Sequence, residues 1–134
     1  MAKASEYIEV AMMKTALVVE GGGMRSVFTA GVLDTFLEHS YDPFDLFIGS
    51  SAGTLNLSAF IAGQKKYSVR LINRLAKSTT FVDWRRFIKG GNAMELAELH
   101  DLLALHDPID LSQAKRRLNS RPFVITSCDK SKGQ

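Results

Sequence analysis

Two serines lie between two glycines in the segment Gly49-Ser50-Ser51-Ala52-Gly53, after an apolar run and before a stretch of helical character. The spacing fits G-x-S-x-G, in which a sharp strand-to-helix turn exposes the central serine as a nucleophile. Flanking glycines tolerate such a turn and let strand and helix approach closely. Ser51 is therefore the candidate nucleophile and Ser50 a small spacer, while a purely structural serine in a tight turn is the alternative.

Three glycines, Gly21, Gly22 and Gly23, end an earlier apolar run, so we expect them at the same edge of the sheet as Ser51. Their backbone N–H groups could hold a phosphate or the oxyanion of an acyl transfer. A dinucleotide site fits poorly, because the last position of G-x-G-x-x-G would be Ser26. The acidic residue that such a site needs for the ribose is also missing from the end of the second strand. The oxyanion hole is favoured, and a glycine turn without chemistry is the alternative.

The elements that must position these residues follow from the apolar pattern. A strand is predicted within 15–23, a helix over 26–39, a second strand over 45–50 and a second helix over 52–62 that ends near Gly63. Such β-α-β-α alternation predicts an α/β fold with a parallel sheet and right-handed crossovers.

The rest of the chain is predicted to be helical from about 65 to 118, followed by a third buried strand within 121–129. Ser26 is predicted to cap the first helix. Three strands make a thin sheet for this fold class, which suggests a fragment of a larger domain.

Length and composition limit the classes of protein to which this chain could belong. The chain has 134 residues, of which 46% are hydrophobic and 23% charged, as expected of a single globular domain. No apolar run is long enough to span a bilayer, and the start does not read as a secretory signal, so we expect a cytoplasmic protein. The net charge of +3 is too small to indicate a nucleic-acid partner, and the single cysteine, Cys128, cannot form an internal disulfide.

The motif pair EGGGMRS and IGSSAG resembles the patatin-like phospholipases, whose signature combines a G-G-G-x-R-G loop with a G-x-S-x-G serine. The segments FTAGVLD, DPFDL and RFIKGGN add to the likeness, which is nearest to bacterial predicted esterases of the alpha-beta hydrolase superfamily. The resemblance implies a three-layer α/β/α fold with a mainly parallel sheet. Residues 15–134 would be the N-terminal portion of that domain, preceded by an extension over 1–14.

The resemblance also implies roles for the motif residues. The three glycines 21–23 would form the oxyanion hole, and Ser51 would be the nucleophile. Arg25 would organise the glycine loop, and Gly49 and Gly53 would support the turn around Ser51. The substrate class would be a lipid or fatty-acyl ester, and neither a metal nor an organic cofactor is implied. One departure is Ser26, which stands where the motif ends in glycine.

The catalytic base is the weak point of the resemblance. Patatin-like enzymes use a Ser-Asp dyad whose aspartate lies in a D-G-G/A motif, and the sequence contains no such motif. Asp129 follows the third strand but matches a non-catalytic position of the family. We therefore expect a serine acyl hydrolase that is inactive as this chain alone, with a catalytically incomplete fragment or interaction module as the alternative.

The histidines and one aromatic, basic segment are two further groups of residues with possible roles. His39, His100 and His106 are expected at the surface or as caps, because the last two do not share a helix face that could bind a metal. The segment 81–91, FVDWRRFIKGG, mixes aromatic and basic residues, which suits either peripheral contact with a membrane or core aromatics beside a solvated basic face.

Overall fold

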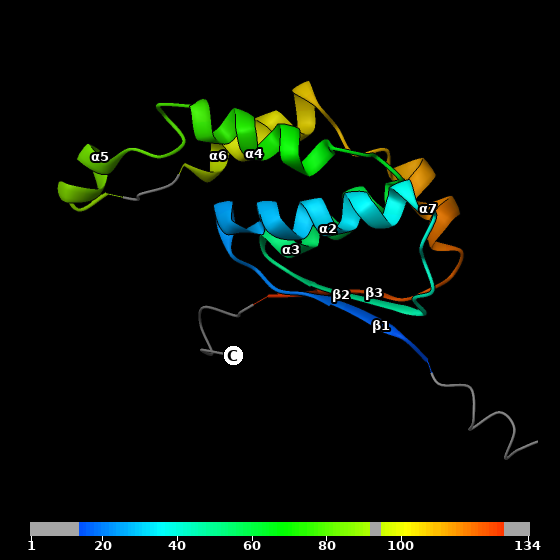
Figure 1. Cartoon of the computed structure of the whole chain (residues 1–134). Helices are drawn as coiled ribbons and strands as arrows, with labels where there is room; N and C mark the ends of the chain where they lie inside the picture. Colours follow the sequence, from blue (N-terminus) through cyan, green and yellow to red (C-terminus); the bar gives the residue numbers. More distant parts are fainter. Residues whose placement is uncertain (1–13, 92–94, 128–134) are drawn as a thin grey trace, which may run out of the picture.

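The computed structural model describes residues 14–91 and 95–127, which form one parallel sheet and a set of helices (Figure 1). Strands β1 (Ala16–Val19), β2 (Leu46–Ser50) and β3 (Phe123–Thr126) pair in the order β1-β2-β3. Both pairings are parallel. The predicted α/β class with a parallel sheet is confirmed, whereas Cys128, Asp129 and most of the N-terminal extension lie outside the described residues.

Helices cover one face of this sheet in the part of the chain that is described. Figure 1 shows α2 (Val27–Glu38), α3 (Ala52–Ala62) and α7 (Leu111–Leu118) on the same side of the strands. On that side Phe47 is fully buried and forms the centre of the main apolar core. On the opposite side Val18 of β1 keeps 66% of its surface exposed. A second helical layer, as in a three-layer arrangement, is not among the described residues.

A further group of helices lies beyond α2 and α3 (Figure 1). It comprises α4 (Tyr67–Lys77), α5 (Trp84–Ile88), α6 (Leu96–Asp101) and the π-helix η2 (Leu102–His106). Their second apolar cluster is centred on Tyr67, whose hydroxyl donates to the backbone oxygen of Asp107 at 2.6 Å. Burial, followed by the nearby Asp107 carboxylate, raises the pKa of Tyr67. The described helices include none long and apolar enough to cross a membrane.

Of the two predicted helix ends, the one at Gly63 is confirmed and the cap at Ser26 is not. Gly63 ends α3 in a left-handed conformation (φ 72°), as the sequence indicates. Ser26 does stand before α2, but its side chain makes no capping hydrogen bond, so that prediction was wrong. It ends the short 3-10 helix η1 (Gly23–Ser26) with helical dihedral angles, whereas a capping side chain needs an extended residue.

Arg121 ties the start of β3 to the loop before β2. Its guanidinium donates to both carboxylate oxygens of Asp42, at 2.8 and 3.0 Å, and to the backbone oxygen of Phe44 at 2.8 Å. The same group stacks 4.8 Å from the ring centroid of Phe47, at the centre of the core. Charge pairing, hydrogen bonding and stacking thus converge on one side chain.

Replacing this arginine tests how much that convergence stabilises the fold. We expect Arg121→Met to lower the free energy of unfolding by about 2 to 3 kcal/mol, because the Asp42 carboxylate and the Phe44 carbonyl lose their donor. The Arg121 and Asp42 side chains are 22% and 26% exposed, so solvent replaces part of the loss. Urea unfolding measures the change. Arg116→Met, on the exposed face of α7, is the matched control, and an equal effect of both variants would contradict the role of Arg121.

Candidate active site

Ser51 lies in the turn between β2 and α3 in a conformation that few non-glycine residues adopt. Its dihedral angles are φ 49° and ψ −125°. A backbone held in such a sparsely populated region costs of the order of 1 to 3 kcal/mol and persists only when the surroundings enforce it. The turn exposes Ser51 at the carboxyl end of β2, where parallel α/β sheets bind their ligands.

The two glycines of the motif enforce this turn through close contacts. A Cβ atom on Gly49 would lie 2.8 Å from the Cα atom of Thr54, in the first turn of α3. A Cβ atom on Gly53 would lie 2.4 Å and 2.5 Å from the backbone oxygens of Glu20 and Val19. No side chain fits at either position, so α3 begins in direct contact with both β2 and the end of β1.

This contact brings the glycine loop beside the serine. A Cβ atom on Gly21 would lie 3.0 Å from the Cβ atom of Ser51. Gly23 then starts η1 with a φ of 54°, and the backbone N–H of Arg25 donates to the oxygen of Gly22 at 3.1 Å. The structure therefore brings together the two motifs that the sequence separates.

The backbone N–H groups of this loop are candidate hydrogen-bond donors. The first N–H groups of a helix have no partner within it, and among the described backbone oxygens none accepts a hydrogen bond from Gly22 or Gly23. The Arg25 guanidinium lies against the loop, with its Nε and Nη2 atoms 3.8 Å from the position of a Cβ on Gly22. Arg25 also borders a recess of about 70 Å³ together with Glu20 and Thr29. This placement suits an arginine that orders the glycine loop.

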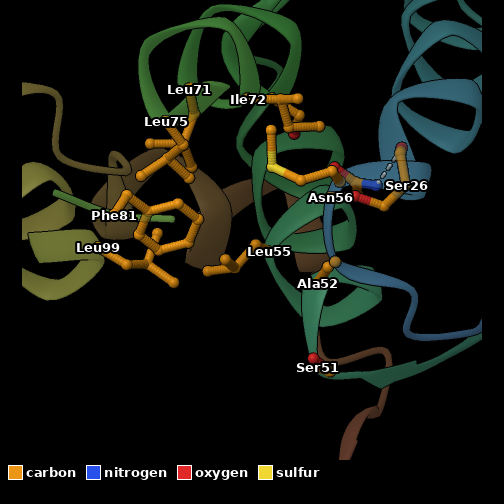
Figure 2. Close-up of a pocket in the computed structure, with 13 residues that line it drawn as sticks. Ser26, Ser51, Ala52, Leu55, Asn56, Leu71, Ile72, Leu75, Phe81 and Leu99 are labelled. Atoms are coloured by element: carbon orange, nitrogen blue, oxygen red, sulfur yellow. Dashed lines mark hydrogen bonds between the residues drawn. The ribbon is translucent and has the colours of Figure 1, made fainter. Parts of the chain in front are cut away.

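A cavity of about 270 Å³ opens next to Ser51 between α3 and the outer helices. Figure 2 shows Ser51 at one end of it, with apolar side chains from α3, α4 and α6 along its walls. The residues that line it are Gly23, Met24, Ser26, Ser51, Ala52, Leu55, Asn56, Ser68, Leu71, Ile72, Leu75, Phe81 and Leu99. No acidic side chain and no histidine occurs among these lining residues, so none of the described residues that line the cavity could act as a base for Ser51.

Sequence reasoning missed Asn56, which joins the two halves of the site. Its side chain is 97% buried, and its Nδ2 atom donates to the backbone oxygen of Ser26 at 3.0 Å. This bond fixes η1, and with it the glycine loop, against the second turn of α3. The available signal was an asparagine between two leucines, Leu55 and Leu57, in a mainly apolar helix.

The three histidines lie away from this cavity. His39 ends α2, His100 lies in α6 and His106 ends η2, and none lines the space beside Ser51. Over residues 14–91 and 95–127, no group of three His, Cys, Asp or Glu side chains could hold a metal ion.

The aromatic and basic segment 81–91 divides between interior and surface. Phe81 is 2% exposed and lines the cavity, as the alternative of core aromatics expects. By contrast, Ile88 and Phe87 in α5 are 82% and 53% exposed. Asp83 caps α5, and its pKa is lowered because the backbone N–H groups of nearby α5 residues donate to the carboxylate.

A family model described as patatin-like phospholipase matches residues 17–128. The chain is 43% identical over 116 residues to a protein of Escherichia coli (strain K12) named "Uncharacterized protein YjjU". This match covers 86% of the chain but 32% of the relative, so the chain spans about a third of that protein's length. No solved structure matches the chain.

A pair of glycine variants tests the close contact that shapes the turn. We expect Gly53→Ala to lower the free energy of unfolding by about 1 to 3 kcal/mol, because the new methyl group would overlap backbone oxygens that cannot rotate away. Gly31→Ala in α2 is the matched control, since a Cβ there meets open space. It should instead stabilise the chain by up to about 1 kcal/mol through helix propensity. Equal effects in urea unfolding would refute the steric argument.

Proposed function

We propose that this chain, which belongs to the patatin-like phospholipase family, supplies the nucleophile and oxyanion-binding part of a serine acyl hydrolase that acts on ester bonds of lipids. The observation that supports it most is the approach of Gly21 to Ser51, which sets a strained serine beside a loop whose Gly22 and Gly23 N–H groups have no acceptor among the described backbone oxygens. The apolar cavity at the same place suits a fatty-acyl substrate.

In the proposed reaction the Ser51 Oγ atom attacks the acyl carbonyl carbon and its proton passes to an aspartate. The carbonyl oxygen becomes an oxyanion, which the backbone N–H groups of Gly22 and Gly23 would stabilise, each typically by about 2.7 to 4 kcal/mol. The N-terminus of α3 adds a positive dipole end at Ser51. Collapse expels the alcohol with the proton from the aspartate, and water then releases the acyl group from the serine.

The aspartate is proposed to come from a part of the protein outside this 134-residue chain. The cavity beside Ser51 is lined without an acidic side chain, and the sequence has no D-G-G/A motif. A carboxylate with a pKa near its free value of about 3.9 is a weak base, so it must be buried and in contact with the serine. The alternative function is a catalytically incomplete module that retains the fold for binding.

Contact with a lipid surface would fit the same function. Figure 1 places α5 on the side of the molecule where α2 and α3 begin, the side on which Ser51 lies. Ile88, in α5, keeps 82% of its surface exposed, and the nearby cations Arg85 and Lys89 are exposed as well. An apolar side chain flanked by cations can insert at the boundary of an anionic bilayer. We propose α5 as a peripheral membrane contact.

Ester hydrolysis distinguishes the proposed enzyme from the incomplete module. The 134-residue chain should show little or no turnover of p-nitrophenyl esters, because its serine lacks a base. A longer form that contains a D-G-G/A motif should hydrolyse them and lose at least about 10⁴-fold in kcat in Ser51→Ala. Ser50→Ala is the matched control and should keep most of the activity. Turnover by the short chain would overturn the missing-base argument, and an inactive longer form would favour the binding module.

Vesicle binding tests the role of α5. The chain should co-sediment with vesicles that contain anionic phospholipid, and Ile88→Asp should weaken this binding because a charge replaces the inserting group. Raising the salt concentration should weaken it as well, since Arg85 and Lys89 contribute through charge. Leu111→Asp, at a 74% exposed leucine of α7, is the matched control. Equal loss in both variants would refute a specific role for α5.

A further inference from the structure

We propose that the cavity beside Ser51 recognises an uncharged ester that carries a hydroxyl group, and that Ser26, Asn56 and Ser68 bind this hydroxyl. The inference rests on the proposed function and deepens it, because it names the substrate class for the same site. The hydroxyl belongs either to the acyl part or to the alcohol part of the ester, and binding of one ester of each kind distinguishes these sources.

The polar side chains that are buried in the described part of the chain gather at this cavity. They belong to Ser26, Asn56 and Ser68, which are 7%, 3% and 8% exposed. All three residues line the cavity beside Ser51, and they come from three separate elements, η1, α3 and α4. Figure 2 shows Ser26 and Asn56 beside each other, across the cavity from Phe81. We call these three residues the polar trio.

The polar trio carries hydrogen-bonding groups that the described residues leave unused. Asn56 donates through Nδ2 to the backbone oxygen of Ser26, but its Oδ1 atom and the hydroxyls of Ser26 and Ser68 have no partner among the described residues. Ser58 in α3 behaves differently, because its hydroxyl donates to the backbone oxygen of Thr54 at 2.8 Å. Buried polar groups in proteins are normally hydrogen-bonded, so a bound group is expected to supply these bonds.

The chemistry of the lining selects an uncharged ligand. Serine hydroxyls both donate and accept, and an asparagine Oδ1 atom accepts, so a ligand hydroxyl matches this set of groups. The described residues that line the cavity include no Lys, Arg, His, Asp or Glu. A phosphate or carboxylate placed there would lose its hydration without gaining a counter-charge. Leucines such as Leu55 and Leu71 complete the wall and suit the hydrocarbon part of the same ester.

Ser26 supports a role in specificity for a second reason. It stands where the G-G-G-x-R-G signature ends in glycine, and its side chain does not cap α2. The hydroxyl is therefore needed neither by the glycine loop nor by the helix, yet it lies buried against the cavity. Asn56 holds Ser26 in this place through the hydrogen bond to its backbone oxygen at 3.0 Å.

Binding of esters to the 134-residue chain tests the preference without requiring catalysis. The chain would be titrated, with its NMR spectrum as the readout, with methyl hexanoate, methyl 3-hydroxyhexanoate, 1-hexanoylglycerol and 1-hexanoylglycerol 3-phosphate. One of the two uncharged hydroxylated esters should bind at least about fivefold tighter than methyl hexanoate, the factor that one net hydrogen bond typically contributes. Which of the two binds tighter identifies the source of the hydroxyl. The phosphate ester should bind no tighter than methyl hexanoate.

Three results of this titration would overturn the proposal. Equal affinities for methyl hexanoate and both hydroxylated esters would mean that water satisfies the polar trio as well as a ligand does. Tightest binding of the phosphate ester would refute the preference for an uncharged ligand. Binding of none of the four esters would refute the site itself.

Serine-to-alanine variants locate the hydroxyl site. Ser26→Ala and Ser68→Ala each remove a hydroxyl that has no protein partner to lose, so the fold should hold, and the NMR spectrum verifies it. Each should lower the ratio between the affinities for the preferred hydroxylated ester and methyl hexanoate, and the double variant should bring that ratio to about one. Ser112→Ala, at an exposed position of α7, is the matched control and should leave the ratio unchanged. A ratio that survives in the double variant would refute the role of the polar trio.

The outcome is separable from that of the proposed function. A preference for a hydroxylated ester in binding, together with a longer form that cannot hydrolyse esters, would support the polar trio as a binding site and refute the hydrolase. Hydrolysis by the longer form, with no such preference in binding, would support the hydrolase and refute the polar trio as a specificity site.

Discussion

The contact between the first turn of α3 and the end of β1 is the constraint on which the candidate site depends. At Gly53 the helix lies so close to the backbone oxygens of Val19 and Glu20 that even a methyl group would overlap them. This approach holds the start of α3 against the end of β1, next to the turn that contains Ser51. The strained dihedral angles of Ser51 and the proximity of Gly21 are consequences of the same close packing.

Helix α3 can impose this constraint because it is held from all sides. It contacts β1 and β2 below, α2 and α7 beside it, and α4 above. Its buried residues are Gly53, Asn56, Leu57, Ala59, Phe60, Ile61 and Ala62, which surround the helix rather than form one stripe. A helix that is apolar all round is a buried helix, and its position is fixed by packing more firmly than that of a surface helix. Asn56 is the one polar residue among these, and its hydrogen bond to the backbone oxygen of Ser26 links α3 to the segment that follows the glycine loop.

Local patterns in the sequence predicted the helices and strands well. They could not predict which residues far apart in the sequence come into contact in the fold. Glycines marked the ends of β1 and α3 because those positions need backbone freedom, and Gly63 adopts the left-handed conformation expected of it. The capping role of Ser26 failed because η1 continues directly into α2, which removes the extended residue that a cap requires. Phe81 and Phe87 share one short segment, and only the packing of α4 and α6 decides that Phe81 turns inward. The cavity was invisible in the sequence for the same reason, since its walls come from residues far apart in the chain.

The packing that holds Ser51 is separate from the base that the proposed reaction requires. Ser51, the glycine loop and the apolar cavity are held in place by contacts among the described residues, without help from a base. Strain at Ser51 is therefore maintained by the fold rather than by its catalytic partner. A carboxylate supplied by another part of a longer protein would need to reach Ser51, the proposed nucleophile, in a turn that is already formed. Preorganised donors of this kind cost no reorganisation during the reaction, so the acquisition of one buried aspartate would be the step that separates a binding module from an enzyme.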